Sequence, residues 1–317
     1  VLVHRVELLR QWQERLQLFL EIPAEAIGAI SGGKSKPSGR LDLAVMQSLV
    51  RQGSVNPLVQ NYGQVIVDEC HHSAASTFEA VLKQVKARYV LGLTATPVRR
   101  DGLQPILFMQ CGPIRHRAVQ PAGAPQRLEL VSRSHQLPAH LPSDLPVQEL
   151  MRHLADNQHR TDQIVAEAVA AWQEGRKLLV LSERTDHVNA IASALAPQLS
   201  ELFVLHGRLG QRQRSGTLAA LEALPPETPR IVVATGRLVG EGFDHPPLDT
   251  LLLAMPVSWR GTLQQYAGRL HRQQAGKTSV RIIDWLDLGH PITQRMWERR
   301  LRGYKAMGYA LTTTVLH

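Results

Sequence analysis

The sequence contains little of what several classes of protein require. Its 317 residues include only two cysteines, Cys70 and Cys111, which provide neither a disulfide framework nor a zinc-binding cluster and suit a reducing, cytoplasmic location. No apolar run approaches the length of about 18 residues that a membrane-spanning helix needs. Aromatic residues make up 5% of the chain, which argues against an extensive platform for stacking bases.

Positive charge exceeds negative charge by a wide margin. The chain has 36 basic and 27 acidic residues, a formal net charge of +9 and an isoelectric point near 10.0, which suits a polyanionic partner. Only 7 of the basic residues are lysines, and arginine is the residue that contacts phosphate in a bidentate manner. Genome composition can produce the same arginine bias, so the charge alone does not establish a nucleic-acid partner.

Apolar strands and amphipathic helices alternate along both halves of the chain, which predicts an α/β fold with parallel sheets. In the first half we predict strands at residues 1–4, 26–30, 41–45, 64–67 and 89–93, and helices at 6–19 and 75–85. In the second half we predict strands at 127–131, 177–181, 202–205, 230–234 and 250–254, and helices at 156–172, 185–196, 210–224 and 291–307. A proline-rich stretch from Pro121 to Pro146 should contain the connection between two domains.

Two adjacent carboxylates, Asp68 and Glu69, follow the apolar run at residues 65–67. At the end of a buried parallel strand such a pair is costly unless it holds a cation or acts as a base. In nucleotide hydrolases the first acid holds Mg²⁺ and the second activates the attacking water. The alternative is a helix N-cap, in which the acids favour the helix dipole.

Further motifs follow the acids in a fixed order. Asp68-Glu69-Cys70-His71 is followed by Leu-Gly-Leu-Thr-Ala-Thr-Pro at residues 91–97, and much later by Gln-Tyr-Ala-Gly-Arg-Leu-His-Arg at residues 265–272. An acidic strand end, a TATP turn and a QxxGRxxR segment in this order resemble the superfamily 2 helicases and translocases. The DECH form and the tail after the TATP turn are most similar to the branch that holds type III restriction subunits and DNA-repair translocases.

The resemblance covers nearly the whole chain and implies two RecA-like parallel-sheet lobes with a cleft between them. Residues 1–117 would form part of the ATP-binding lobe with motifs Ia to III. Residues 118–290 would form the C-terminal lobe with motifs IV to VI, and residues 291–317 a basic C-terminal helix. We expect the first lobe to be incomplete at its N-terminus, because the Gly-rich phosphate loop that precedes motif Ia in this family does not occur before Val1.

The resemblance also assigns roles in ATP hydrolysis. It implies that Asp68 holds Mg²⁺ through water, that Glu69 is the general base, and that Arg269 and Arg272 stabilise charge on the γ-phosphate. A helix would place the two arginines, three residues apart, on one face, although such residues can also form plain surface ion pairs. The positions matching the nucleotide site and its coupling to movement are His71, Thr94, Thr96, Gly242, Asp244, Gln265 and Gly268. For the two threonines an ordinary turn with capping hydroxyls is the alternative.

Positions at other predicted strand ends match the family's nucleic-acid contacts. These are Arg5, Gln47, Ser48, Ser182, His206, Gly207, Thr235 and Gly236. Such contacts go mainly to the phosphate backbone, so binding should be sensitive to salt and only weakly dependent on base sequence.

A literal match to the phosphate-loop pattern GxxxxGK[ST] occurs at residues 28–35. A phosphate loop requires a strand before it and a helix after it, whose N-terminal amides bind the anion. Here Pro37, Gly39 and then an apolar strand follow, which leaves no room for a helix. We therefore predict a surface loop near nucleic acid or phosphate, with a true phosphate loop as the alternative.

The resemblance implies an ATP- and Mg²⁺-dependent helicase or translocase that moves on nucleic acid, on DNA rather than RNA. Two other functions fit the same residues. Without a phosphate loop the chain could be an inactive nucleic-acid-binding fragment, because much of the nucleotide affinity would be lost. It could also be a regulatory or assembly subunit built on the same scaffold.

Overall fold

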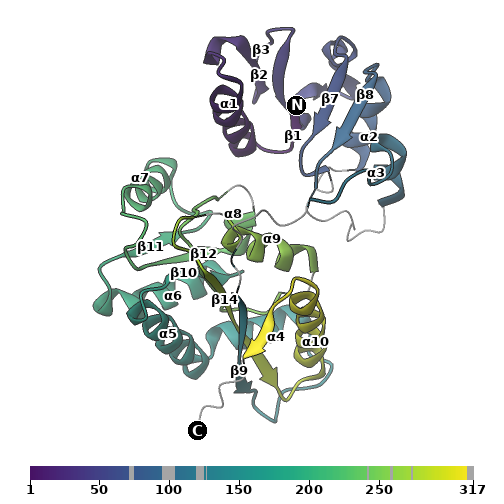
Figure 1. Ribbon diagram of the computed structural model, residues 1–317. Helices are drawn as coiled ribbons and strands as arrows, with labels where there is room; N and C mark the ends of the chain where they lie inside the picture. Colours follow the sequence, from purple (N-terminus) through teal and green to yellow (C-terminus); the bar gives the residue numbers. More distant parts are fainter. Residues whose placement is uncertain are drawn as a thin grey trace. The chain divides into compact units, whose positions relative to one another are not determined.

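The computed structural model describes residues 1–70, 75–94, 104–118, 125, 127–240, 243–257, 260–272 and 274–312. The chain divides into two compact units, Val1–Val119 and Gln120–His317. Each unit is an α/β domain with its own mainly parallel sheet (Figure 1). No helix in the described part of the chain is long and apolar enough to cross a membrane.

The first unit has a six-stranded sheet in the order β3-β2-β4-β1-β7-β8. All neighbours are parallel except β2 and β3, which form an antiparallel hairpin. The strands are β1 (Leu2–Val3), β2 (Ile27–Ser31), β3 (Lys34–Lys36), β4 (Leu41–Val45), β7 (Gln64–Val67) and β8 (Tyr89–Gly92). A separate small hairpin joins β5 (Val50–Arg51) to β6 (Ser54–Val55).

Helices cover this sheet because successive strand residues point to opposite faces. On β1, Val3 packs in the cluster that contains Leu9 of α1 (Val6–Leu20), whereas Leu2 packs in the cluster that contains Phe78 of α2 (Ala75–Gln84). The remaining elements are α3 (Gln104–Cys111) and the short 3₁₀ helices η1 (Ala24–Ala26), η2 (Met46–Leu49) and η3 (Pro57–Gln60).

Strand β8 is an edge of the described sheet and leaves apolar side chains exposed. Tyr89 is 58% exposed and Leu91 is 43% exposed, and Met109 on α3 is 81% exposed. Buried parallel strands normally carry apolar residues on both faces because helices cover them. The apolar sequence of β8 is therefore that of an interior strand placed at an edge.

The segment that matches the phosphate-loop pattern is a β-hairpin. Its residues run from β2 through a turn at Gly32 and Gly33, with φ values of 54° and 83°, into β3. A strand therefore follows the glycines where a phosphate loop would have a helix. This rules out the phosphate-loop alternative, and it also corrects the predicted loop, because residues 34–36 pair with β2.

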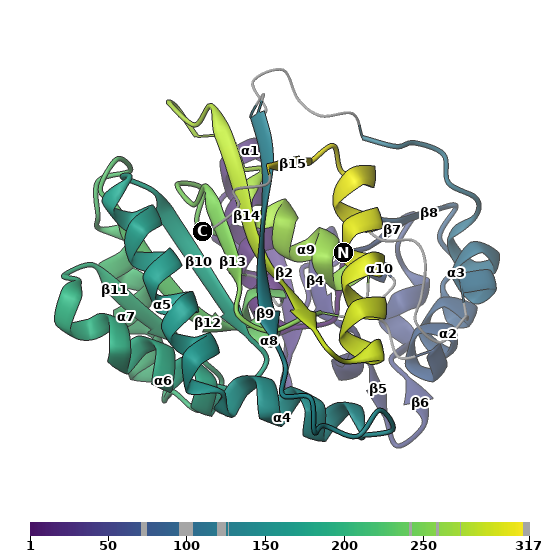
Figure 2. The same cartoon turned by 90° about the horizontal axis from the view of Figure 1, so that it is seen from below.

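The second unit has a seven-stranded parallel sheet in the order β11-β12-β10-β13-β14-β9-β15 (Figure 2). Its strands are β9 (Arg127–Gln136), β10 (Lys177–Ser182), β11 (Leu202–Leu205), β12 (Arg230–Thr235), β13 (Thr250–Leu253), β14 (Ser279–Leu288) and β15 (Ala310–Thr312). Its helices are α4 (Val147–Asp156), α5 (Gln158–Gln173), α6 (Thr185–Leu195), α7 (Gln211–Glu222), α8 (Gly236–Gly240), α9 (Arg260–Leu270) and α10 (Pro291–Ala306), with the 3₁₀ helix η5 (Ala196–Gln198).

Two hydrophobic clusters lie on the two faces of the second sheet. On β10, Leu178 and Val180 belong to the cluster formed with α5 and α6. Leu179 and Leu181 belong to the cluster that includes side chains of α7, α9 and α10. The alternation explains why the central strands are apolar at every position, as the sequence predicted.

The predicted elements of this unit are incomplete. The helix predicted at 156–172 corresponds to α5, whose N-cap Asn157 accepts a hydrogen bond from the backbone N–H of Arg160 (2.9 Å), whereas α4 before it was not predicted. Strand β14 was not predicted, because it carries Asp284 and Asp287 in a sequence that otherwise suits a core strand. The structure buries both carboxylates by pairing each of them with an arginine.

The two carboxylates of β14 tie helices to the sheet. Asp284 accepts from Nε of Arg300 on α10 (2.7 Å) and from the hydroxyl of Tyr304 (2.8 Å). Asp287 accepts from Nε of Arg160 on α5 (2.8 Å), and all four charged side chains are at most 3% exposed. The basic C-terminal helix thus packs within the second unit. The predicted domain boundaries at residues 117 and 290 stay predictions.

The pair at Asp284 can be tested by replacing its partner. Arg300→Met should lower the free energy of unfolding of the second unit by about 3–5 kcal/mol, because Asp284 would remain buried without its cation. Arg299→Met is the matched control, since this neighbouring arginine is exposed on the same helix and its loss should change little. Urea unfolding followed by circular dichroism measures both, and equal stabilities would contradict a structural role for the pair.

Candidate functional site

The two acids lie at the carboxyl end of β7. The backbone N–H of Asp68 donates to Leu2 O (2.9 Å), which extends the parallel pairing with β1 to the first acid. The indole Nε1–H of Trp12, on α1, donates to Oδ2 of Asp68 (2.7 Å), and the backbone N–H of Glu69 donates to Oδ1 (3.0 Å). The orientation of the Asp68 carboxylate is therefore set by a helix that lies 56 residues earlier in the chain.

Glu69 has a backbone conformation that side chains rarely adopt. Its φ is +45°, and the only other described non-glycine residues with positive φ are Glu21 and Gln52. A non-glycine residue in this region costs on the order of 1–3 kcal/mol, and such residues concentrate at functional sites. The next residue is fixed again, because Cys70 N donates to Leu93 O (3.0 Å). The strain thus falls on the predicted general base.

The surroundings of Asp68 fit a magnesium ion held through water. Each carboxylate oxygen has a second lone pair beyond the one that accepts a described hydrogen bond, and the side chain is half-buried rather than sealed. Within the described ranges no group of three His, Cys, Asp or Glu could hold a metal. In proteins Mg²⁺ keeps several waters and binds one or two carboxylates together with substrate phosphates.

The neighbouring strand ends of the first unit carry the predicted nucleic-acid contacts. Arg5 begins α1 just after β1, and Gln47 and Ser48 lie in η2 just after β4. Because β4, β1 and β7 are parallel neighbours, these residues and the acids lie along one edge of the sheet. Thr94 follows β8 at the same edge, whereas His71 and Thr96 lie outside the described residues.

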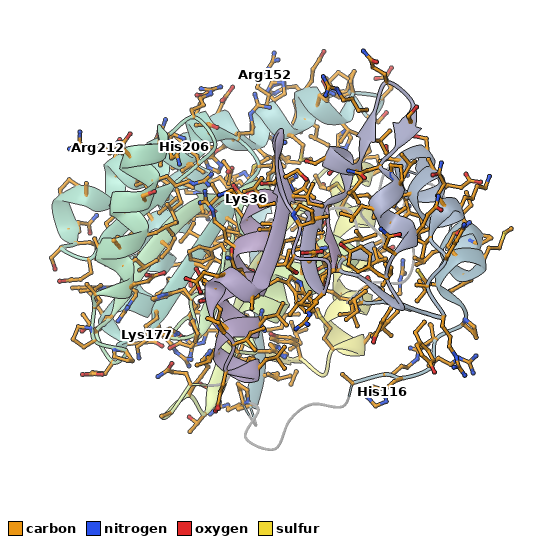
Figure 3. The ribbon with its side chains drawn as sticks, turned by 90° about the horizontal axis from the view of Figure 1, so that it is seen from above. Lys36, His116, Arg152, Lys177, His206 and Arg212 are labelled. Carbon is orange, nitrogen blue, oxygen red and sulfur yellow. The ribbon has the colours of Figure 1, made fainter. Side chains whose placement is uncertain are left out.

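Ser48 also lines a groove between the two hairpins of this unit. Its Oγ accepts a hydrogen bond from the N–H of Gly32 at the tip of the β2–β3 hairpin (3.1 Å). The groove has a volume of about 600 Å³, and among the described side chains that line it Arg51 carries the charge. Its polar lining consists of hydroxyl and amide side chains, from Ser35, Ser48, Gln52, Ser54 and Asn56. Lys36, exposed on β3, adds positive charge to the same hairpin (Figure 3).

In the second unit the predicted residues also gather at strand ends. Ser182 and Thr235 are register partners at the ends of β10 and β12, and His206 and Gly207 follow β11 (Figure 3). Ser182 is 1% exposed, and its hydroxyl contacts Nδ1 of His187 (3.1 Å) and accepts from Arg184 N (3.2 Å). This position argues that Ser182 shapes the start of α6 rather than contacting a ligand.

Gly236, at the start of α8, is packed against Tyr266, a buried tyrosine of α9. A Cβ at Gly236 would overlap the hydroxyl of Tyr266 and a carboxylate oxygen of Glu183. The Tyr266 hydroxyl donates to Glu183 Oε1 (2.8 Å), which joins α9 to the end of β10. Sequence reasoning missed Glu183, although it follows Ser182 directly and an acid after a core strand was the available signal.

The two predicted arginines do not share a helix face. Helix α9 ends at Leu270, so Arg269 is in its last turn and Arg272 lies two residues beyond it. Arg272 Nε donates to Oδ1 of Asp244 (3.0 Å), which brings together two of the predicted residues. Gly268 is exposed, with open space where a Cβ would be, and Gln265 is half-buried on the same helix. Gly242 lies outside the described residues.

Two histidines of the second unit, His245 and His187, are buried next to arginines. Nη1 of Arg230 contacts Nε2 of His245 (3.2 Å), an arrangement in which the ring nitrogen must accept and the imidazole must be neutral. Burial and the nearby Arg230 lower the pKa of His245 to about 4. Burial and the nearby Arg160 and Arg184 likewise lower the pKa of His187 to about 4.

Comparison with known proteins relates both units to helicases. Residues 1–99 match the family described as type III restriction enzyme, res subunit. The chain is 25% identical over 286 residues to a protein named "Probable helicase D10" from Escherichia phage T5, covering 88% of this chain and 62% of that protein. It is 29% identical over 117 residues to "DNA 3'-5' translocase XPB2" from Sulfurisphaera tokodaii, covering 37% of this chain and 25% of that protein.

A solved structure shows the same fold across the chain. The structure of Dbp5 from S. cerevisiae, bound to RNA and ADP BeF3, superposes with a TM-score of 0.63 at 12% identity, covering 98% of this chain and 76% of that one. The likeness confirms the predicted architecture of two RecA-like α/β lobes. The chain spans less than two thirds of the length of the phage and archaeal relatives.

The two buried histidines predict how stability depends on pH. A native pKa near 4 lies below the unfolded value of about 6.5, so between these values the unfolded state binds more protons and stability falls as the pH falls. Between pH 7 and pH 5 we expect a loss of roughly 2 kcal/mol for each histidine, measured by urea unfolding. His245→Gln keeps an acceptor for Arg230. It should reduce the loss of stability between pH 7 and pH 5 by the contribution of one histidine. The exposed His153→Gln should leave it unchanged, and a flat wild-type profile would contradict the assignment.

Proposed function

The chain belongs to the superfamily 2 helicases, and from this premise we propose that it serves as part of an ATP-dependent helicase or translocase moving on nucleic acid. The observation that carries the proposal is the pair Asp68 and Glu69 at the carboxyl end of β7. The first carboxylate is oriented by Trp12, and the second residue has a strained backbone. An ordinary helix N-cap requires neither feature.

The residues divide the chemistry of ATP hydrolysis between them. Bound Mg²⁺ would neutralise charge on the β- and γ-phosphates, and Asp68 is the residue that would hold it through water. Glu69 accepts a proton from the attacking water. Arg269 and Arg272 supply positive charge to the transferring phosphoryl group, with Asp244 restraining Arg272. Gln265, Gly268, His71, Thr94, Thr96 and Gly242 remain proposed members of the nucleotide site and its coupling to movement.

We propose DNA as the track and the cytoplasm as the location. The archaeal relative is named as a DNA translocase. The Dbp5 structure contains RNA, but its 12% identity supports a similar fold and not a similar substrate. Contacts along the strand ends of both sheets would reach the phosphate backbone, which carries no sequence information itself. Binding should therefore weaken with salt and vary little with base sequence.

The phosphate loop is proposed to come from a segment outside these 317 residues. Residues 28–35, the one phosphate-loop match noted in the sequence, form a hairpin. The exposed apolar side chains of β8 support a further strand beside this edge with a helix that would cover Leu91 and Tyr89. The same hairpin favours a second candidate function, an inactive nucleic-acid-binding remnant. A regulatory or assembly subunit is the third candidate.

ATP hydrolysis stimulated by DNA separates these functions. If the chain is active, Glu69→Gln should reduce kcat by about 10²–10⁴-fold, because the substitution removes the general base and little volume. Because the phosphate loop is proposed to lie outside these 317 residues, the assay uses the protein that includes that segment. No hydrolysis with salt-sensitive DNA binding would then favour the remnant. A chain that neither hydrolyses ATP nor binds DNA would favour the regulatory scaffold and overturn the proposed activity.

Arg51 provides a test of nucleic-acid binding in the first unit. We expect Arg51→Ala to weaken binding of a single-stranded oligonucleotide about fivefold and to lower the slope of log K against log salt by about 0.7, because one phosphate contact is lost. The loss should be the same for unrelated base sequences. Fluorescence anisotropy at several salt concentrations measures it.

Arg152→Ala is the matched control, because Arg152 is exposed on α4 and lies on no predicted strand end (Figure 3). It removes the same charge from the chain as a whole. Equal losses in the two variants would mean that only net charge matters and would contradict a specific contact at Arg51.

A further inference from the structure

We propose that Lys277 is a positioning residue that holds Arg272 and Asp244 in the arrangement needed to act on phosphate. Its Nζ donates hydrogen bonds to three backbone oxygens, those of Pro246 (2.5 Å), Leu270 (3.0 Å) and Arg272 (2.8 Å). The inference rests on the proposed function only for the role of Arg272. The contacts themselves belong to the fold of the second unit.

The three carbonyl groups come from the two segments that carry the ion pair. Leu270 is the last residue of α9 and Arg272 is the arginine itself, while Pro246 lies two residues after Asp244. An ammonium group has three N–H donors, so each donor of Lys277 is matched by one carbonyl. A single side chain therefore fixes both ends of the Asp244–Arg272 pair through the backbone.

The contact at Leu270 also explains where α9 ends. The last carbonyls of a helix lack partners within the helix and carry partial negative charge. The ammonium group binds one of these carbonyls together with that of Arg272, so the chain turns away from the helix axis before Arg272. The predicted shared face for Arg269 and Arg272 fails for this reason.

Lys277 is itself held by a fixed part of the fold. Its backbone N–H donates to Gln274 O (3.1 Å), and Gly276, with φ of 80°, completes the turn that leads into β14. The ion pair that it supports is more open, since Arg272 is 43% exposed. An exposed pair alone holds its partners weakly, so the half-buried ammonium group is the stronger restraint.

The charges around Lys277 make its action dependent on pH. Burial lowers the pKa of Lys277 to about 8, Asp249 and Asp244 oppose this shift, and Lys177 adds to it. Lys277 also contributes to lowering the pKa of His245 and His271. Above pH 8 the neutral amine has two donors for three carbonyls, so the restraint on Arg272 weakens.

Stability should not follow the same course. A lysine with a native pKa below its unfolded value of about 10.4 leaves the unfolded state with more bound protons between the two values. Stability then increases as the pH rises from 8 towards 10. Weakened restraint of Arg272 without loss of stability is a combination that a purely structural lysine would not produce.

The experiment compares Lys277→Met and Lys277→Arg with Lys305→Met, which removes an exposed lysine from the last turn of α10. The first readout needs no hydrolysis: solvent exchange of the Arg272 Nε–H, measured by nitrogen-15 NMR and assigned with Arg272→Lys. Relative to the exposed Arg299, we expect exchange at Arg272 to accelerate about tenfold in Lys277→Met at pH 7, and in the wild type above pH 8, because fewer donors then hold the Arg272 backbone. Lys305→Met should match the wild type.

The second readout is DNA-stimulated ATP hydrolysis. Lys277→Met should lower kcat by about 10- to 100-fold with KM for ATP unchanged, since a misplaced group costs rate rather than ground-state binding. Lys277→Arg keeps the charge, so it should restore part of kcat and remove the decline of the wild type above pH 8. In an Asp244→Asn background, Lys277→Met should have little further effect.

The outcomes distinguish this inference from the proposed function. A wild-type chain that hydrolyses no ATP counts against the proposed function, and the NMR readout still decides whether Lys277 restrains Arg272. Unchanged exchange at Arg272 in Lys277→Met would overturn the inference, as would an active Lys277→Met with wild-type kcat. If Lys277→Met does not fold, the pH titration of the wild type gives the decision, and exchange at Arg272 that rises through pH 8 only in parallel with exchange at the exposed Arg299 overturns the inference.

Discussion

The ion pair between Asp284 on β14 and Arg300 on α10 joins a strand and a helix where neither charge contacts solvent. Removing either partner alone would leave an unpaired buried charge, so the pair holds α10 against β14. Helix α9 depends on it in turn, because Gly303 of α10 lies against Leu263 of α9, where a Cβ would come within 2.9 Å. The helix that carries Arg269 is thus placed by a contact with α10, which carries none of the motifs.

The same logic applies to the first unit on a smaller scale. Parallel strands end at one edge, so the residues after β1, β4 and β7 come together whatever their distance in the sequence. The sheet alone leaves the side chains free to rotate, and the hydrogen bond from Trp12 removes that freedom from Asp68. In both units the sheet brings the motif residues together, and a polar contact from a helix or turn then orients them.

Sequence reasoning succeeded where one physical pattern decided the outcome. The bounds of β4, β7 and β11 were predicted to the residue, because each is a short, mainly apolar segment. Strand β14 was missed because its charges are neutralised by arginines from α5 and α10, which no local pattern reveals. Asp68 and Glu69 could be singled out from their neighbours in the sequence. Trp12 and Lys277 could not, since their roles arise from contacts with distant or non-helical segments.

The two phosphate-associated patterns of the first unit show what a motif requires. DECH has only four letters, yet it follows a buried strand and places Glu69 in a conformation that an unconstrained turn would avoid. The eight-residue match at 28–35 is longer, yet its glycines turn the chain into β3, so it lacks the helix N-terminus that would bind an anion. Gly28 is required there for packing, because a Cβ would overlap the buried Asp42. A phosphate-binding pattern therefore predicts chemistry only when the backbone around it can present its amides to the ligand.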